Sequence, residues 1–221
     1  AKLGVGWIVA VDFDRVDLTN LPRLVGATRW DALEPLAASR RPFLQKIGKR
    51  FARHKVSLAK RVAQRAQSGI RYEAIVGDIT AEETALRMKD CDFVFLCADS
   101  AQSRLVFNAL VHQYLIPGIQ VGAKVSVKKE TGDISDIFTA SRPVLPYSGG
   151  GCLWCNQLIP AARLQEEALS EDERLHYAYL DDPEVTAPSV ITLNAAAAAQ
   201  AANDFLFSYL GLYENLAALP Y

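Results

Sequence analysis

The chain has 221 residues, of which half are apolar and 22% are charged, and its formal net charge is −1. This is typical of one large globular domain, with or without an insert, and excludes disordered, collagen-like and disulfide-framework chains. The balanced charge gives no field that would recruit nucleic acid or a membrane, and no apolar run reaches the ~18 residues of a membrane span. We therefore expect a protein that binds neither nucleic acid nor membranes, and the four cysteines, too few for a disulfide scaffold in a chain of this length, favour a reducing, cytoplasmic setting.

Apolar patterning predicts strands and helices in alternation. Strands are expected at residues 7–11, 70–76, 93–97 and 119–127, and helices at 43–66, 82–88, 101–115 and 190–210. The first and third strands are continuous apolar runs, of the kind that parallel sheets bury on both faces. Because alternating strands and helices imply right-handed crossovers, the sequence predicts an α/β fold with one doubly wound, mostly parallel sheet.

Residues 141–188 interrupt this alternation. They contain prolines, three consecutive glycines, the Cys-x-x-Cys pair Cys152 and Cys155, and an acidic stretch with eight acids against one arginine between 165 and 184. We predict a surface excursion outside the sheet core, with a helix over 160–179. The predicted organisation is an α/β core over 1–140, a crossover segment over 141–188 and a C-terminal helix, within 189–221, that packs on the core.

Three predicted strands end at acidic residues, first Asp12 with Asp14, then Asp78, then Asp99. In open α/β sheets ligands bind beyond the carboxyl ends of the strands, where an early acid commonly accepts ribose hydroxyls. A later acid is well placed to hold Mg²⁺, which prefers carboxylate and phosphate oxygens. A single aspartate at a strand end is more often only a polar terminus, but several together favour a nucleotide site in the core.

Positive charge is concentrated between residues 40 and 65, where ten Lys and Arg residues occur without any acid. Most of them fit a solvated helix face. Lys55 differs, because it lies four residues after Phe51 and three before Leu58, on or beside the apolar stripe of the predicted helix. A charge there costs desolvation unless it meets a negative group, such as a phosphate or a strand-end aspartate.

Asn20 and Arg23 follow Asp12 closely and could reach the same crevice. A guanidinium suits phosphate oxygens, and an Asn amide can orient a ribose or a phosphate. His54, beside Lys55, could also touch this site. The basic stretch has no interleaved aromatic side chains on which bases could stack, which argues against nucleic acid as its ligand.

Four blocks of the sequence, taken in order, resemble the ThiF/MoeB/HesA family, whose members are relatives of the ubiquitin-activating enzymes. They are VDFDRVDLTNLPR at 11–23, KVSLAKR at 55–61, FVFLCADS at 93–100 with Arg104, and Ile116-Pro117. The motif CLWC at 152–155 and the helix start at 187–194 are similar to bacterial ThiF-like members. The resemblance implies a Rossmann-like α/β fold and a homodimer.

The resemblance also implies ATP-dependent adenylation of the C-terminal glycine of a ubiquitin-like or sulfur-carrier protein with a β-grasp fold. Carried over position by position, it implies the following roles: Asp12 with Asp14 at the ribose, Asn20 and Arg23 at the triphosphate, Lys55 at the α-phosphate, and Asp99 on Mg²⁺. Catalysis of this kind needs positioning and electrostatic stabilisation, with no side chain acting as nucleophile in the adenylation step.

The family's Gly-rich phosphate loop lies upstream of the first block, so Leu3-Gly4-Val5-Gly6 corresponds to the turn before the family's second strand. The family also uses an Arg from an N-terminal helix, often supplied by the other protomer. On this comparison we expect the sequence to lack its first strand, its Gly-rich loop and that arginine, as part of a longer polypeptide.

The cysteines depart from the family pattern. Many relatives bind structural zinc through two Cys-x-x-Cys pairs, but only Cys152 and Cys155 form such a pair here, so we expect no four-thiolate zinc site within this chain. Cys91 and Cys97 are expected to be small core residues. Cys152 or Cys155 could accept the acyl group from the adenylate as a thioester; an unreactive half-site or a reducible pair is equally compatible with the sequence.

Two other functions remain open from the sequence. A catalytically inactive ThiF-like binding module would keep the fold and the partner groove without turnover. A nicotinamide-dependent dehydrogenase would use Asp12 on the ribose, but the sequence offers no plausible proton-relay residues, and Asn20, Arg23 and Lys55 would be unexplained.

Overall fold

The computed structural model describes residues 1–127, 131, 133–146, 151–169 and 190–212. By their internal contacts the residues form two compact units, one over 1–88 and one from residue 89 onward. Each unit carries its own sheet, of two strands in the first and three in the second. The described architecture is therefore mixed α/β, and a single doubly wound sheet remains a prediction. The three-part organisation drawn from the sequence also remains a prediction.

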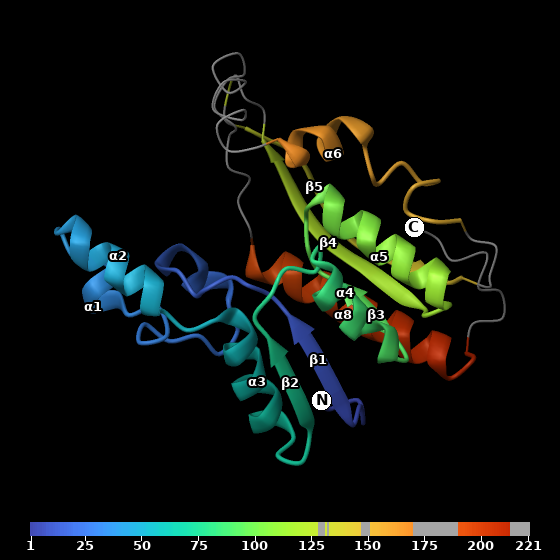
Figure 1. Cartoon of the computed structure of the whole chain (residues 1–221), viewed down its shortest axis with the longest axis horizontal. Helices are drawn as coiled ribbons and strands as arrows, with labels where there is room; N and C mark the ends of the chain where they lie inside the picture. The colour runs from blue at the N-terminus through green and yellow to red at the C-terminus, as the bar shows by residue number, and fades with distance from the viewer. Residues whose placement is uncertain (128–130, 132, 147–150, 170–189, 213–221) are drawn as a thin grey trace. The chain divides into compact units, whose positions relative to one another are not determined.

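The first unit begins with β1 (Trp7–Val11), which pairs in parallel with β2 (Arg71–Ile75) from Trp7 opposite Arg71 to Val11 opposite Ile75 (Figure 1). Between them come the 3₁₀ helix η1 (Leu18–Arg23) and the helices α1 (Glu34–Ala37), α2 (Pro42–Phe51) and α3 (Lys55–Ala66). The short α4 (Glu82–Leu86) and the 3₁₀ turn η2 (Arg87–Asp90) follow. The predicted strand at 7–11 is confirmed, although it is only half-buried rather than covered on both faces.

The predicted single helix over 43–66 is wrong, because α2 and α3 are separated at residues 52–54. There the backbone is extended and pairs with the segment after β1: Val16 donates to the carbonyl of Arg53 at 2.8 Å, and Lys55 donates to the carbonyl of Asp14 at 2.9 Å. These bonds take the place of helical hydrogen bonds at the break, and they set the first residue of α3 beside the end of β1.

The expected apolar stripe through Phe43 and Phe51 is not buried either, since these side chains are 72% and 67% exposed. α2 instead packs on α1 through Gly48, where a β-carbon would lie 2.6 Å from the backbone nitrogen of Ala37. Only glycine permits that close approach of the two helices. The core of this unit lies elsewhere, around Val16, Ala32 and Leu58, which are buried together.

The second unit contains β3 (Val94–Leu96), α5 (Ala101–Tyr114), β4 (Gly118–Val127), β5 (Ile134–Val144), α6 (Ala161–Ala168) and α8 (Ile191–Tyr209). β3 pairs in parallel with β4, and β4 pairs antiparallel with β5 along nearly its whole length. The predictions of β3, α5, β4 and the C-terminal helix are confirmed, and α5 ends where Leu115 adopts a left-handed conformation.

The prediction that residues 141–188 lie outside the sheet core is wrong for the start of that range. Residues 141–144 end strand β5, and Val144, Leu153 and Ile159 are buried in one cluster with Phe107 of α5. Pro143 is tolerated because β5 forms an edge of its sheet, where one missing N–H donor costs little. Of the helix predicted over 160–179, α6 (Ala161–Ala168) is confirmed, and the remainder falls mostly outside the described residues, as does most of the acidic stretch.

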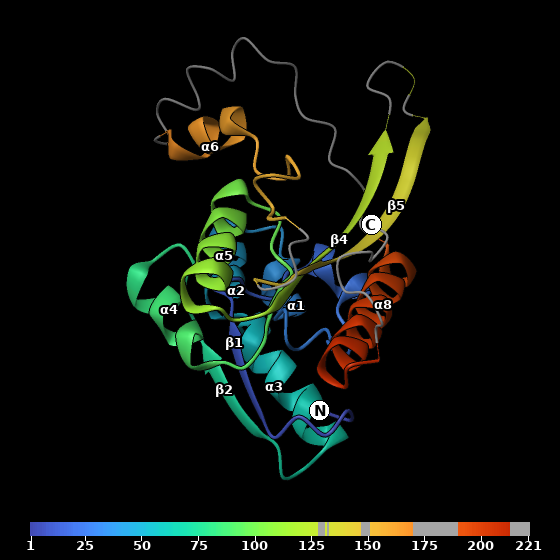
Figure 2. The same cartoon turned by 90° about the vertical axis from the view of Figure 1, so that its right-hand side faces the viewer.

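Helices cover both faces of the three-stranded sheet. Leu96 of β3 points into the cluster with α5, whereas its neighbour Phe95 contacts Phe205 of α8 at a ring-centroid distance of 5.7 Å. Figure 2 shows α5 and α8 on opposite sides of the sheet accordingly. Among the described residues, no helix is both long enough and apolar enough to cross a membrane.

Candidate functional site

The residues after β1 and the start of α3 form a charged cluster, which we call the Asp12 cluster and define as Asp12, Asp14, His54 and Lys55. The ammonium of Lys55 donates to a carboxylate oxygen of Asp14 at 2.5 Å. Their backbones are joined as well, so the pair is held by two elements rather than by side chains alone. The Lys55 side chain is 24% exposed and that of Asp14 is 51% exposed, so this ion pair is accessible to water.

Asp12 lies deeper than Asp14. Its carboxylate accepts the backbone N–H of Asp14 at 2.7 Å. Burial raises the pKa of Asp12 above its ordinary value, although the N–H of Asp14 and the charge of Lys55 act in the opposite direction. The carboxylate is thus partly desolvated and would gain from further hydrogen-bond donors, which ribose hydroxyls can supply.

His54 stands immediately before α3, and the Nδ1 atom of its ring is buried without a hydrogen-bond partner among the described residues. Buried polar atoms are usually paired, so an unpaired ring nitrogen beside Asp12 is unusual. The sequence predicted that His54 could touch this site only because it is the neighbour of Lys55 in the chain. Its burial could be seen only in the structure.

Asn20 and Arg23 lie in η1 and hold each other. The guanidinium of Arg23 donates to the side-chain oxygen of Asn20 and, at 2.9 Å, to the carbonyl of Thr19. Asp17 caps this 3₁₀ helix by accepting the N–H of Thr19 at 2.9 Å, a bond that lowers the pKa of Asp17. The structure therefore joins the predicted residues of this unit in two pairs, Asp14 with Lys55 and Asn20 with Arg23.

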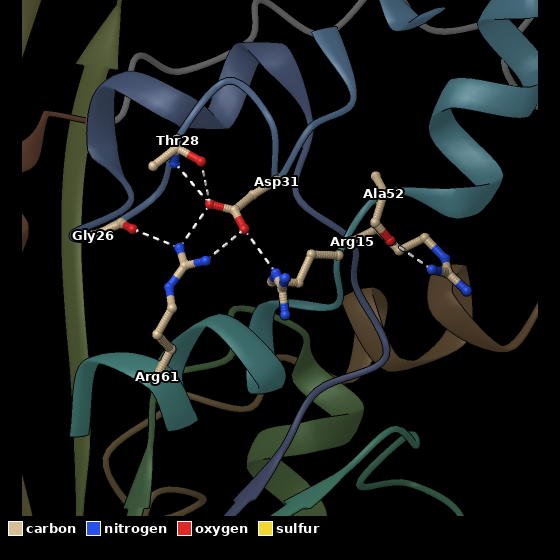
Figure 3. A network of polar contacts seen from close by, with 7 residues as sticks. Arg15, Gly26, Thr28, Asp31, Ala52 and Arg61 are labelled. Carbon is tan, nitrogen blue, oxygen red and sulfur yellow. Dashed lines mark hydrogen bonds and ion pairs between the residues drawn. The ribbon is translucent and has the colours of Figure 1, made fainter. Parts of the chain in front are cut away.

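Sequence reasoning missed a second charged cluster, which we call the Asp31 cluster and define as Thr28, Asp31, Arg53 and Arg61 (Figure 3). Asp31 is 4% exposed, and its carboxylate accepts hydrogen bonds of 2.7–2.8 Å from Arg53, Arg61 and both the N–H and hydroxyl of Thr28. These donors, Arg61 foremost, hold the pKa of Asp31 far below its ordinary value. Arg61 also donates to the carbonyl of Gly26 at 2.8 Å.

The Asp31 cluster accounts for part of the basic stretch at 40–65, because Arg53 and Arg61 neutralise a buried acid. These two arginines also line an open pocket of about 510 Å³ on α3, together with Ser57, Lys60, Gln64 and Arg65. The sequence signal was weak: Asp31 and Glu34 both lie shortly before an acid-free run, and the partners of Asp31 lie 22 and 30 residues away from it.

In the second unit Asp99 is exposed, three residues beyond β3 and just before α5. The first turn of α5 is capped from within the unit: Ser100 accepts the N–H of Ser103 at 3.0 Å, and Glu167 of α6 accepts the N–H groups of Ala101 and Gln102 at 2.8 Å. A carboxylate at a helix N-terminus complements the helix dipole. Among the described residues, no three His, Cys, Asp or Glu are grouped as a metal site.

Cys152 and Cys155 lie together in the turn before α6, with their sulfur atoms 3.2 Å apart and both thiols free. Burial raises the pKa of the Cys152 thiol, but N–H donors from Cys155 and Trp154 outweigh it and leave that pKa below its ordinary value. Cys91 is partly buried and Cys97 is exposed, so the prediction that both are core residues is wrong for Cys97. Cys97 is the first residue after β3, and its side chain is exposed whereas that of Leu96, the last residue of the strand, is buried.

The parallel strand pairs β1–β2 and β3–β4, each joined through helices, define this chain as a mixed α/β protein. Aspartates follow these strands at positions 12, 78 and 99. The chain belongs to the ThiF family, since the ThiF family model matches residues 1–203. The resemblance carried by the four sequence blocks is thereby confirmed. Among curated protein sequences, the comparison found no significant match.

Solved structures of similar fold include MccB of E. coli with ATP (18% identity, TM-score 0.60), the microcin C7 biosynthetic enzyme MccB in complex with N-formylated MccA (18%, 0.63) and PaaA (17%, 0.57). Each match covers 97% of this chain, and 51%, 53% and 59% of the respective solved chain. At these identities the likeness concerns the fold. The chain spans little more than half the length of these proteins.

Proposed function

We propose that this protein activates a carboxylate of a polypeptide by ATP-dependent adenylation. The observation that carries the proposal is the Asp12 cluster, in which a lysine ammonium and a partly desolvated carboxylate stand at the end of the first strand of a ThiF-family chain. In the reaction a carboxylate oxygen of the substrate attacks the α-phosphorus of ATP, and the bond to the departing pyrophosphate breaks.

The roles proposed for residues of the first unit are those that the family resemblance implies, and the charges and hydrogen bonds of these residues support them. Asp12 would accept the ribose hydroxyls, with Asp14 keeping Lys55 extended beside it. Lys55 would exchange its accessible ion pair with Asp14 for the α-phosphate of the highly charged triphosphate, at little cost because exposed ion pairs contribute little. Asn20 and Arg23, already joined in η1, would present an amide and a guanidinium to the triphosphate.

Asp99 would hold Mg²⁺. Mg²⁺ is usually held by one or two carboxylates together with substrate phosphates and water, so the exposed Asp99 fits it without a cluster of protein ligands. The ion would mask charge on the pyrophosphate as it leaves. The roles of Asp99 and of the residues in the first unit are separate proposals, and each needs its own variant.

The substrate carboxylate is proposed to be the C-terminal glycine of a ubiquitin-like or sulfur-carrier β-grasp protein. The solved relatives support a polypeptide more broadly, because MccB was solved with ATP and with selenomethionine-containing MccA. Family resemblance also favours a homodimer. After adenylation, Cys152 or Cys155 is a candidate for acceptance of the acyl group as a thioester, since Cys155 is exposed and the Cys152 thiol is acidified.

The experiment is ATP–pyrophosphate exchange with the intact protein and candidate polypeptides ending in glycine, each compared with its C-terminally amidated form. We expect exchange that needs the free carboxylate and falls by orders of magnitude in Asp99→Ala. Asp92→Ala, which removes another exposed acid near β3, is the matched control and should leave exchange unchanged. Tight binding of a polypeptide without any exchange would instead support a binding module.

A thioester would be detected as a covalent adduct between protein and substrate that hydroxylamine or an excess of a small thiol releases by taking over the acyl group, and that a non-thiol reductant leaves intact. Loss of this adduct in only one of Cys152→Ala and Cys155→Ala would identify the acceptor. An adduct that survives both substitutions excludes these two cysteines, and ATP–pyrophosphate exchange that continues in both variants shows that adenylation itself does not depend on them.

A further inference from the structure

Two arginines of the second unit lie on the α5 side of the three-stranded sheet. Arg142 of β5 and Gln120 of β4 are direct partners in the strand register, and the guanidinium of Arg142 donates to the side-chain oxygen of Gln120 at 2.7 Å. Because side chains alternate along a strand, Ser141, which donates to Asp204 of α8 at 2.5 Å, marks the opposite side of the sheet. Arg142 therefore points toward α5, the helix that carries Arg104 (Figure 2).

The positive charge of these two residues, which we call the arginine pair, is not neutralised within the part of the protein that the structure describes. Neither guanidinium forms an ion pair with a carboxylate of a described residue. Arg104 donates to the carbonyl of Leu158 at 3.1 Å, while its Nε atom is buried and has no hydrogen-bond partner among the described residues. Burial, followed by the charge of Arg104, lowers the pKa of Arg142. Two partly desolvated cations therefore stand close enough to repel each other.

The Asp31 cluster shows how this protein neutralises two arginines that lie together. There one buried carboxylate accepts hydrogen bonds from both guanidinium groups. At the arginine pair, the group that meets the guanidinium of Arg142 is instead the amide of Gln120, which is 2% exposed and whose nitrogen donates to the carbonyl of Val121 at 3.1 Å. This buried amide fixes the direction of Arg142 but brings no negative charge. The charge that Asp31 supplies to its arginines is thus missing at the arginine pair.

We propose that the arginine pair is a binding site for a carboxylate group of the polypeptide substrate. Gln120 lies opposite Leu96, the last residue of β3, and Asp99 follows three residues later. Ligands of open α/β sheets bind beyond such strand ends. A guanidinium presents parallel N–H groups that match the two oxygens of a carboxylate.

The existence of this site does not depend on adenylation, because it follows from the uncompensated charge of the arginine pair. The assignment of its ligand to the polypeptide rests on the proposed function. There Arg23, Lys55 and Asp99 serve the nucleotide and its metal ion, and no residue is assigned to the carboxylate of the substrate. The arginine pair would supply that contact from within the second unit.

The test is a titration of the intact protein, without ATP, followed by nuclear magnetic resonance of the arginine Nε–H groups. The probes are N-acetylglycylglycine, which ends in a free carboxylate, its uncharged amide, N-acetylglutamate α-amide, which carries a side-chain carboxylate, and inorganic phosphate. The signals of the arginine pair are assigned by their absence in Arg104→Gln and Arg142→Gln. We expect both signals to shift with the carboxylate probes and to stay in place with the uncharged amide.

Three variants show whether the pair binds the probe. Arg142→Gln should weaken binding of N-acetylglycylglycine roughly tenfold or more, because one charged donor group is lost. Arg163→Gln, which removes an exposed arginine of α6, is the matched control and should leave the affinity unchanged. Gln120→Glu would place a carboxylate of the protein on Arg142. Binding should then be lost while the midpoint of thermal unfolding stays the same or rises, so this variant is informative even where Arg142→Gln does not fold.

The site is overturned if the carboxylate probes and the uncharged amide bind equally, or if Gln120→Glu keeps the affinity of the original protein. Phosphate that binds more tightly than either carboxylate would overturn the assignment to the polypeptide. The tighter of the two carboxylate probes identifies a terminal or a side-chain carboxylate as the ligand. Because the titration contains no ATP, carboxylate binding without any ATP–pyrophosphate exchange would leave the site in place and contradict only the proposed adenylation.

Discussion

Two carboxylates in the first unit, Asp31 and Asp12, face cationic side chains in different ways. Asp31 is buried and accepts hydrogen bonds from four donor groups, two of which are guanidinium groups. Asp12 is half-buried and receives one backbone N–H, while the nearby Lys55 is bonded to Asp14 instead. Their pKa values move in opposite directions, down for Asp31 and up for Asp12.

The difference separates a structural charge cluster from one suited to a ligand. A carboxylate whose hydrogen-bonding capacity is filled by the protein gains nothing from a ligand and stabilises the fold. A carboxylate that is desolvated but incompletely paired costs stability until a ligand supplies the missing donors. Four substitutions test this contrast, with expected effects that decrease in size.

Asp31→Asn should lower the free energy of unfolding by about 2–4 kcal/mol, because it leaves the charges of Arg53 and Arg61 without their partner. The loss stays below that of a fully buried pair because both arginines keep some access to water. Urea denaturation monitored by circular dichroism measures it, with the exposed Asp92→Asn as control. A loss below 1 kcal/mol would contradict a structural role for the Asp31 cluster.

The same variant has a defined pH dependence. Because the pKa of Asp31 is lowered on folding, its stabilising contribution is complete above the ordinary value of 3.8 and disappears as the pH falls below it. The difference in stability between the original protein and Asp31→Asn should therefore shrink below about pH 4. A difference that stays constant down to pH 2 would show that the charge of Asp31 is not the cause.

Gly26→Ala should cost about 1–3 kcal/mol. Gly26 has a φ of +76°, and a β-carbon there would lie 2.6 Å from Cγ2 of Val62, so both backbone strain and crowding displace the carbonyl that Arg61 binds. Gly4→Ala is the matched control, since its φ of +83° imposes the strain without any atom within 4 Å. Equal losses of unfolding free energy in the two variants would mean that crowding at Gly26 contributes nothing.

Lys55→Ala should change the unfolding free energy by less than about 1 kcal/mol, because its ion pair with Asp14 is exposed to water. ATP–pyrophosphate exchange should nevertheless be abolished, since the α-phosphate loses its cation. Lys60→Ala removes an exposed lysine of the same helix and should leave exchange intact. Normal exchange in Lys55→Ala would remove the Asp12 cluster from the proposed mechanism.

Asp12→Asn should leave stability unchanged or slightly increase it near pH 7, because burial of the charged carboxylate is relieved. The sign follows from the raised pKa: the unfavourable contribution appears as the pH rises through the pKa of the folded state and is absent below 3.8. Binding of ATP, measured by calorimetry, should weaken. The control is Asp78→Asn, an exposed strand-end acid that accepts the N–H of Thr80 at 2.8 Å in the same way. Equal ATP affinities in the two variants would contradict the ribose role.

The sequence predicted most elements, because each depends on a short pattern. The run Trp7–Val11 and the periodicity of 101–115 were sufficient for β1 and α5. The break between α2 and α3 could not be predicted, because it depends on backbone pairing of residues 14–16 with 53–55 across nearly forty positions. β5 was missed because its proline signalled a loop, whereas its place at a sheet edge tolerates it.

The candidate site was predictable for those residues whose place relative to a strand or a helix can be recognised from the sequence. An aspartate after a strand and a lysine at the start of a helix can be recognised from spacing, and the structure joins Lys55 to Asp14. The Asp31 cluster was not predictable, because burial of one acid and its pairing with Arg53 and Arg61 are consequences of tertiary packing. Spacing in the sequence identifies residues whose side chains suit a ligand. Only the packed structure shows whether other residues of the protein already occupy the hydrogen-bonding positions of those side chains.

The three tryptophans of the chain mark three of the regions described above. Trp7 begins β1 under the guanidinium of Arg71, Trp30 precedes Asp31, and Trp154 lies between the two cysteines. All are substantially exposed, at 40%, 75% and 50%. Indole emission responds to solvent, to a cation over the ring and to neighbouring thiols, so variants that retain one tryptophan each would report separately on the strand, the buried acid and the thiol pair. The protein thus carries an intrinsic fluorophore at β1, next to the Asp31 cluster and in the turn that holds Cys152 and Cys155.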